Sequence, residues 1–283
     1  MHGWWRDLAD LVLPTECAGC GRPRTVLCPR CRAVLGGSPP RRVRPAPEPP
    51  GLPAVHAAAP YADEVRAALL AHKERGALAL AAPLGAALAG AVRAGLRRAG
   101  HGGGGAVRVR RAGYPGTVLL VPVPSARRAV RARGHDPARR IALAAAAELR
   151  RSGTSARAPA VLRQRRAVAD QSGLDSRQRL ANLAGALEVT PGGVRLLEEG
   201  PVVLVDDLMT TGASLAEAAR AVTSAVYAAS VREGMGERNS GTRRKEGNPL
   251  YGASELAGTY GAGEVICAAV VASSPDSFEI NRN

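Results

Sequence analysis

The run from Asp206 to Ser214 combines, over a few residues, the side chains that bind a sugar phosphate. Two consecutive acids, Asp206 and Asp207, follow the apolar run Val-Val-Leu-Val. A turn of small and hydroxyl-bearing residues comes next, made of Thr210, Thr211, Gly212, Ala213 and Ser214. Backbone N–H groups and the positive end of a helix dipole bind phosphate at such a turn, and carboxylates accept hydrogen bonds from ribose hydroxyls. The run therefore predicts a sugar-phosphate site at the carboxyl end of a strand.

The two adjacent carboxylates need an explanation of their own, because they repel both each other and a phosphate. A sugar phosphate resolves the conflict by presenting hydroxyls to the acids and its phosphate to the turn. The acids can also favour an oxocarbenium-like transition state or hold Mg²⁺. Gly212 lets the backbone approach the phosphate, and Ser214 with Glu217 has the spacing of a capping box. In the simpler alternative the acids only end a strand and Ser214 only caps a helix; the ordered combination favours the ligand site.

A second group of reactive side chains lies near the N-terminus, where two CxxC pairs occur before residue 32. Their four cysteines are Cys17, Cys20, Cys28 and Cys31. Two such turns can aim four thiolates at one point, which is the geometry of a tetrahedral zinc site without an open position. Disulfides and a redox pair are the alternatives; a reducing cytoplasm and the presence of two pairs favour structural Zn²⁺. Cys267 stands alone in an apolar run and is expected in the core.

The composition, with 46% hydrophobic and 22% charged residues over 283 positions, excludes a chain that is disordered throughout. The formal charge of +15 comes almost entirely from Arg, since Lys occurs only at Lys73 and Lys245. It is explained by a non-specific basic surface or by a face that binds polyanions. The most apolar run, residues 77–92, is short for a membrane span and contains Pro and Gly. We expect a cytoplasmic protein without membrane insertion.

Alternating strand and helix patterns predict an α/β fold with a parallel sheet and helices on both faces. Expected strands cover residues 54–59, 117–123, 202–205 and 265–271. Expected helices cover residues 60–76, 78–98, 139–151 and 215–226, and residues 101–105 form a break. Residues 163–179 are expected to be a loop that runs into a short helix.

The expected organisation has a zinc module, a linker and one larger domain. The module covers residues 1–35, a linker rich in Pro and Arg covers 36–53, and the α/β domain covers 54–283. Residues 229–263 are rich in Gly, Ser and charge, and they are far longer than a usual helix-to-strand connection. We expect a disordered surface insertion there, with a partner-binding or regulatory segment as the alternative.

The strand, acids and turn around Asp206–Ser214 resemble the phosphoribosyl pyrophosphate (PRPP) motif of type I phosphoribosyltransferases. The segments 121–125, 131–136 and 163–182, together with the four-cysteine module, resemble the ComF family of ComFC- and GntX-like proteins. The resemblance covers about residues 8–228 and the last strand. Ser214 stands where Thr is usual and keeps the hydroxyl, whereas His135-Asp136 stands where an aromatic residue and Asn are common. That departure argues against a base-stacking role for His135. The alternatives for this residue are an acid/base role and a simple loop role, and we favour the loop role.

The resemblance implies a type I phosphoribosyltransferase-like sheet, with Asp206 and Asp207 as the catalytic acids that hold the ribose and the turn residues as the 5′-phosphate site. It implies pyrophosphate contacts from the loop after residue 122 and from a lid, for which the candidates are Ser125, Arg127, Arg128, Arg163 and Arg165. The alternative for each of these arginines is a solvated surface position without a role in ligand binding. His72-Lys73 resembles part of a hood element near the acceptor, and a solvated helix face is the alternative that we favour.

The implied ligand is PRPP with Mg²⁺, and three hypotheses about function are open. The first is transfer of the phosphoribosyl group to an unknown nitrogen acceptor with pyrophosphate release. The second is PRPP binding without turnover, linked by the resemblance to a competence helicase and DNA uptake. The third is a zinc-dependent adaptor for single-stranded DNA in which the PRPP site is vestigial; the intact acids and turn argue against it. The acceptor, the pathway and the oligomeric state do not follow from the sequence.

Overall fold

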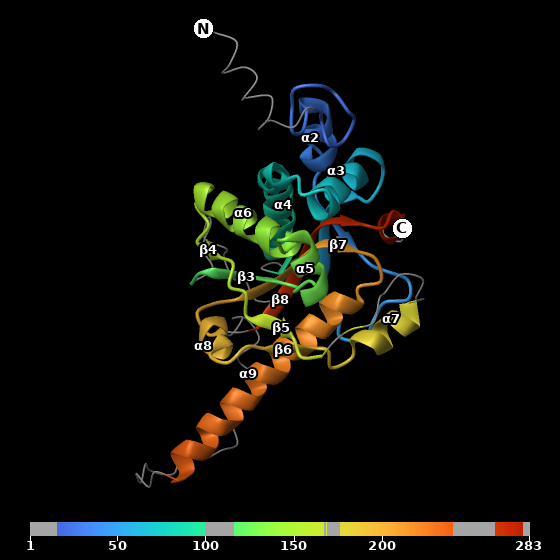
Figure 1. Ribbon diagram of the computed structural model, residues 1–283. Coiled ribbons are helices and arrows are strands. Elements are labelled where there is room, and N and C mark those ends of the chain that lie inside the picture. Colours follow the sequence, from blue (N-terminus) through green and yellow to red (C-terminus); the bar gives the residue numbers. More distant parts are fainter. Residues whose placement is uncertain (1–15, 100–115, 167, 169–175, 240–263, 280–283) are drawn as a thin grey trace.

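The computed structural model describes residues 16–99, 116–166, 168, 176–239 and 264–279, and its centre is a six-stranded, mostly parallel sheet (Figure 1). The strand order is β1-β2-β8-β7-β3-β4, in which only the edge strand β1 runs antiparallel to its neighbour. These strands are β1 Arg41–Val43, β2 Val55–Pro60, β3 Val118–Pro122, β4 Ala156–Arg157, β7 Val202–Met209 and β8 Val265–Ser273. A separate antiparallel pair consists of β5 Leu162–Gln164 and β6 Leu187–Val189.

Helices cover both faces of the large sheet, as the alternating pattern predicted. The helices are α2 Pro29–Gly36, α3 Asp63–Glu74, η1 Leu78–Leu80, α4 Ala81–Ala99, α5 Arg127–Arg133, α6 Pro137–Arg151, α7 Ser176–Leu183, α8 Gly193–Leu197, α9 Ala213–Asn239 and α10 Asp276–Glu279. Alternate residues of β7 enter two different cores: Val203 and Val205 pack with α3, α4 and α6, whereas Val202 and Leu204 pack with α8 and α9. A continuous apolar run is therefore what this central strand requires.

The strand order reverses direction between β3 and β7, and this reversal defines where a ligand can bind. From β3 the chain passes through α5 and α6 to β4 on one side, and from β7 it passes through α9 to β8 on the other. Because α6 and α9 lie on opposite faces, the two connections diverge at the carboxyl ends of β3 and β7, which is where ligands bind in open α/β sheets. The residues that follow these two strands are the loop 122–128 and the turn 210–214.

The expected linker 36–53 is partly wrong, because it contributes to both the sheet and the core. Arg41–Val43 pair with Val55–Ala57 as the edge strand β1, and Val43 is buried. Helix α2 also continues to Gly36, and Leu35 belongs to the main apolar core. One buried Val among Arg and Pro carries too little alternation to distinguish a three-residue edge strand from a linker.

The expected insertion at 229–263 is wrong for its first residues, because α9 continues through them to Asn239. Helix α9 extends beyond the sheet (Figure 1). The Ala- and Glu-containing segment propagates a helix that already begins in the core, although it lacks the apolar stripe that would have revealed it. Residues 240–263, and the break expected at 101–105, lie outside the described residues.

One helical stretch among the described residues, Leu78–Ala99, is long and apolar enough to cross a membrane, with a mean hydropathy of 1.5. The sequence analysis rejected the apolar run 77–92 as a membrane span because it is short, but the helical stretch that contains most of it continues to Ala99. Within its most apolar window, 61% is buried inside the protein. Its apolar residues Leu84, Leu88 and Val92 belong to the core, so this stretch packs as the central helix of the domain.

The contact between α4 and α6 depends on Gly85 and yields a test of the fold. A Cβ atom added to Gly85 would lie 2.5 Å from the Ala144 Cβ and 2.8 Å from the Ala145 N. Gly85→Ala should therefore lower the free energy of unfolding by about 1–3 kcal/mol. At Gly90, in the same helix, the nearest atom to an added Cβ is 3.5 Å away, so Gly90→Ala should be neutral or stabilising by up to about 1 kcal/mol. Denaturant unfolding of both variants measures the difference; equal effects would contradict this packing.

Candidate sugar-phosphate site and metal centre

The acids Asp206 and Asp207 lie inside the last half of β7, which continues to Met209 instead of ending before them. The Asp207 N–H donates to Asp206 Oδ1 at 2.8 Å, and this contact fixes the first carboxylate against the strand. Burial, followed by the charge of Asp207, raises the pKa of Asp206 well above its usual value. The two carboxylates therefore repel each other, and a nearby cation or a hydrogen-bond donor from a ligand would reduce this repulsion.

Lys73 provides such a cation, in contrast to the expectation from the sequence. Its Nζ atom lies 3.2 Å from Asp207 Oδ2, and the side chain of Asp207 is only 8% exposed. The charges of Asp207 and Asp206 raise the pKa of Lys73 although burial opposes the shift. The solvated helix face expected for His72-Lys73 is therefore wrong: His72 is 1% exposed, and Lys73 faces the acids. The contact joins α3 to β7 across more than a hundred residues, which no local spacing reveals.

Histidines and a second ion pair hold the last turn of α3 beside the start of α6. His135 Nε2 lies 3.1 Å from the His72 carbonyl oxygen, and its Nδ1 lies 3.2 Å from the Arg133 carbonyl oxygen. The Arg133 guanidinium donates to both carboxylate oxygens of Glu74, at 2.9 and 2.8 Å. His135 is thus a buried structural residue, which agrees with the loop role, and it connects α3 to the segment that follows β3.

The turn after β7 has the backbone that the sequence predicted and a neighbour that it did not. Gly212 has φ +75° and precedes α9, while Thr210 is exposed and Thr211 is half-buried. A Cβ at Gly212 would lie 3.0 Å from Leu52 and 3.3 Å from Pro45. Glycine is therefore required both by the left-handed conformation and by the segment 45–52 that packs against the turn.

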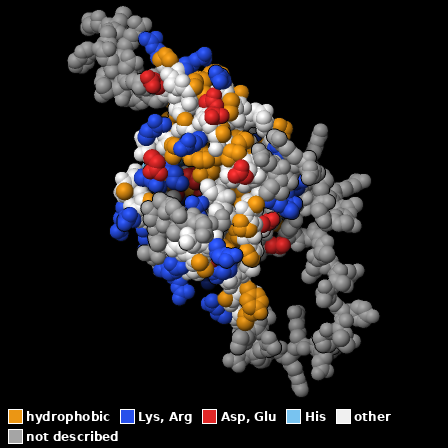
Figure 2. Space-filling model, turned by 90° about the vertical axis from the view of Figure 1, so that its right-hand side faces the viewer, with side chains coloured by type: hydrophobic (Ala, Val, Ile, Leu, Met, Phe, Trp, Pro, Cys, Tyr) orange, Lys and Arg blue, Asp and Glu red, His pale blue; other side chains and the backbone are white. Residues whose placement is uncertain are grey.

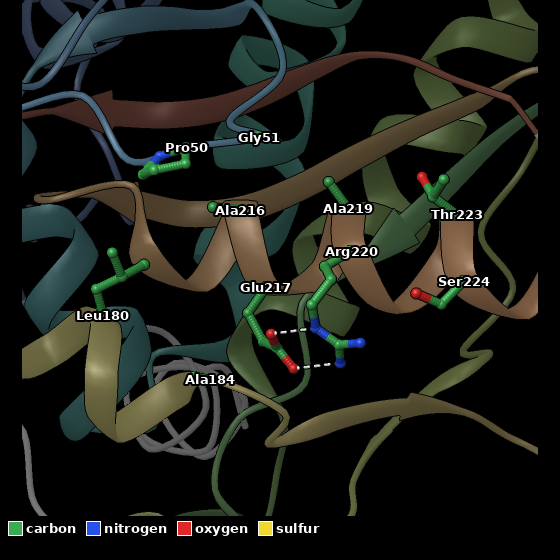
Figure 3. Close-up of a pocket in the computed structure, with 10 residues that line it drawn as sticks. All are labelled: Pro50, Gly51, Leu180, Ala184, Ala216, Glu217, Ala219, Arg220, Thr223 and Ser224. Carbon is green, nitrogen blue, oxygen red and sulfur yellow. Dashed lines mark hydrogen bonds and ion pairs between the residues drawn. The ribbon is translucent and has the colours of Figure 1, made fainter.

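The capping box expected from Ser214 and Glu217 does not form. Glu217 instead accepts hydrogen bonds from Arg220 Nε and Nη2, both at 2.7 Å (Figure 3), and it also accepts one from the Leu187 N–H at 3.0 Å. Although burial opposes the shift, Arg220 and the backbone N–H groups lower the pKa of Glu217. The side chain joins α9 to β6, and it lies on a groove of about 560 Å³ between α7, α9 and residues 50–51. The acids and the turn do not line this groove.

The loop after β3 places Ser125 close to the start of α6. Its N–H and Oγ lie 3.4 and 3.3 Å from the Asp136 carboxylate, which also accepts from the Arg139 N–H as the N-cap of α6. Asp136 thus has a capping role at the position where the family resemblance suggested Asn. The next two candidates, Arg127 and Arg128, are exposed at the start of α5.

The lid candidates are only partly brought to the site. The Arg163 guanidinium donates to Glu188 at 2.8 Å within the β5–β6 pair, and the exposed Arg165 lies just beyond that pair. Arg179 on α7 is the arginine that reaches the turn, with Nη1 3.5 Å from Thr210 Oγ1. Its position within the 163–182 segment pointed to it, but composition alone did not separate it from the other arginines. Residues 169–175 lie outside the described part of the chain.

The four N-terminal cysteines lie together, as their spacing predicted. Their Sγ atoms are all within 4.8 Å of one another, and the Cys20–Cys28 pair is 3.6 Å apart. A tetrahedral Zn²⁺ with bonds of about 2.3 Å requires sulfur separations of roughly 3.8 Å, so the residues fit this ion. No disulfide joins them, and hydrogen bonds from the backbone lower the pKa of Cys17 to about 6 although burial opposes this.

The metal centre shares the core of the α/β domain. Cys17, Leu27, Cys28 and Leu35 belong to the same apolar cluster as Leu69 of α3. On the surface the Arg30 guanidinium lies 3.3 Å from Glu64 at the start of α3. An added Cβ at Gly19 would lie 2.8 Å from Cys31 Sγ, so the first CxxC turn needs glycine for close approach to the sulfur.

Comparison with known proteins gives no relative: no family model matches the chain, and no curated protein matches it. The functional interpretation therefore depends on the geometry of the residues above.

Zinc analysis of two cysteine variants tests the metal centre. Cys28→Ser should remove the bound zinc and lower the unfolding midpoint by roughly 5–10 °C, since about 1 kcal/mol corresponds to 2–4 °C in a domain of this size. Cys267 is the matched control, because it is buried in β8 away from the cluster and burial raises its pKa to about 12. Cys267→Ala should retain the metal. Stoichiometric zinc in purified Cys28→Ser would contradict the four-cysteine site.

Proposed function

We propose that this chain is a ComF-family, type I phosphoribosyltransferase-like protein that binds PRPP with Mg²⁺. The observation that carries the proposal is the place of the acids and the turn. Asp206, Asp207 and residues 210–214 lie at the carboxyl end of β7, beside the point where the strand order reverses. A sugar phosphate satisfies both groups, since its hydroxyls meet the carboxylates and its phosphate meets the N-terminus of α9.

Each part of the ligand has a proposed partner on this side of the sheet. The ribose hydroxyls bind Asp206 and Asp207, and the 5′-phosphate binds the turn from Thr210 to Ser214. The pyrophosphate binds the loop after β3, near Ser125, Arg127 and Arg128. Arg179 covers the turn, with Arg163 and Arg165 on the segment that precedes it. The carboxylates also have the oxygen donors that Mg²⁺ prefers, and the ion would neutralise charge on the leaving pyrophosphate.

The reaction that follows is substitution at the anomeric carbon of the ribose. The bond from carbon to pyrophosphate oxygen breaks with the electron pair on oxygen, and a bond to the acceptor nitrogen forms as that nitrogen releases its proton to water. The buried carboxylates stabilise positive charge that develops on the sugar, and the turn holds the sugar in place. The protein needs no covalent intermediate for this chemistry.

Calorimetric titration with PRPP and Mg²⁺ tests the binding site. The wild type should bind, and Asp206→Asn/Asp207→Asn should weaken binding by about 100-fold or more, because each lost charge-assisted hydrogen bond contributes about 1.5–3 kcal/mol. The double variant should fold, since it removes the repulsion that raises the pKa of Asp206. Glu198→Gln/Glu199→Gln, at two exposed residues before the amino end of β7, removes the same charge and is the control for charge alone. Unchanged affinity in the folded, zinc-loaded double variant would overturn the proposal.

A second candidate function, binding of single-stranded DNA, is supported by the arginines around α5. Figure 2 shows Lys and Arg side chains spread over one face with acids among them, which is typical of a solvated surface. The segment from α5 into α6 differs. It exposes several arginines that form no ion pair with a described acid: Arg127, Arg128, Arg131, Arg139 and Arg140. A phosphate backbone is the natural partner of such a cluster.

Fluorescence anisotropy with a labelled single strand, at several salt concentrations, tests this second function. The triple variant Arg127→Ser/Arg128→Ser/Arg131→Ser should bind more weakly, and its slope of log affinity against log salt should fall by about 0.7 for each phosphate that it no longer neutralises. A triple variant at the exposed Arg22, Arg66 and Arg195 has the same net charge and should bind like the wild type. Equal weakening in both triple variants would show that only total charge matters.

A further inference from the structure

Among the described residues, Lys73 is the cation that forms an ion pair with the two adjacent carboxylates, through Asp207. Its ammonium contacts Asp207 on β7, while its helix neighbours contact the segment after β3. The carbonyl of His72 lies 3.1 Å from His135 Nε2, and Glu74 is held by Arg133. Lys73 therefore lies between the carboxyl end of β7 and the chain that follows β3.

The ion pair is accessible to a ligand. The Lys73 side chain is 33% exposed, in contrast to 8% for its buried partner Asp207. A ligand can therefore reach the ammonium without unfolding α3. When ribose hydroxyls donate to the carboxylate, they replace the ammonium as hydrogen-bond donors and leave it free to contact another anion.

The other basic side chains near this point are less able to take that role. Arg133 directs its guanidinium at Glu74 through two hydrogen bonds. Arg127 and Arg128 are exposed at the start of α5, where a contact with an anion is screened by water. Lys73 is half-buried beside the acids, and an ammonium there attracts an anion more strongly than an exposed one does.

We propose that Lys73 binds the diphosphate end of the ligand and alternates between two partners, Asp207 in the free protein and pyrophosphate in the complex. The inference rests on the proposed function, because it takes the ribose to lie on Asp206 and Asp207. Lys73 thereby makes the carboxylate pair compatible with a ligand that carries several negative charges. It contributes to the recognition of a sugar that is diphosphorylated at the anomeric carbon, in contrast to a simple sugar monophosphate.

Comparison of three ligands on one variant tests this role. The variant Lys73→Gln removes the charge but can still donate a hydrogen bond to Asp207, which should preserve folding. With Mg²⁺ present, it should bind PRPP and inorganic pyrophosphate about 10- to 100-fold more weakly, as expected for a lost hydrogen bond to a charged group. The affinity of the variant for ribose 5-phosphate, which lacks the diphosphate, should differ from that of the wild type by less than about threefold. Lys73→Arg, which keeps the charge, should restore most of the PRPP affinity.

Arg66, on the exposed side of the same helix, is the matched control, and Arg66→Gln should leave all three affinities unchanged. Thermal unfolding and zinc content of each variant verify that the fold is retained. If Lys73→Gln weakens the binding of PRPP and of ribose 5-phosphate by the same factor, the inference is overturned while the proposed function stands. The same holds if Lys73→Gln weakens the binding of neither ligand. If the wild type binds neither sugar phosphate, the proposed function itself is overturned, and the inference fails with it.

Discussion

Two carboxylates on consecutive residues of a buried strand repel each other, and the arrangement of this protein around β7 compensates for that repulsion. The Asp206 carboxylate accepts a hydrogen bond from the Asp207 backbone N–H, and the Asp207 carboxylate forms an ion pair with the Lys73 ammonium. Asp207 is buried and Asp206 is half-buried, so water screens these charges less than it screens charges on an open surface. In the proposed function, ribose hydroxyls that donate hydrogen bonds to both carboxylates relieve the remaining repulsion.

The fold places the other components with respect to this pair. The reversal of strand order between β3 and β7 separates α6 from α9, so that the chain after β3 and the turn after β7 both follow the carboxyl ends of these neighbouring strands. Helix α3 then supplies Lys73 from a segment that precedes both strands. Its last turn is held by the contacts of His72 with His135 and of Glu74 with Arg133. The ammonium is therefore presented by a fixed helix end, which makes its position precise before a ligand arrives.

The sequence was informative where short-range spacing carries the chemistry. The CxxC pairs predicted the sulfur cluster, the apolar run before Asp206 predicted the central strand, and the β-α alternation predicted the sheet with helices on both faces. It failed where the signal was a contact between distant segments. The pairing of Lys73 with Asp207 and the hydrogen bond from the Leu187 N–H to Glu217 have no local pattern. Strand β1 was missed because three residues carry too little periodicity, and the length of α9 was missed because its second half has no apolar stripe.

Helices α2 and α3 share one apolar core, which connects the cysteine cluster to the helix that carries Lys73. Leu27 and Leu35 pack in the same cluster as Leu69, one turn before Lys73 on the helix that supplies the ammonium. To the extent that metal coordination orders α2, it also orders the end of α3. Linkage then requires the reverse as well: a ligand that holds Lys73 must strengthen metal binding by the same free energy by which the metal favours the ligand. If the proposed ligand binds at Lys73, an ion held by the four cysteines would therefore act as a heterotropic effector of a site that it does not contact.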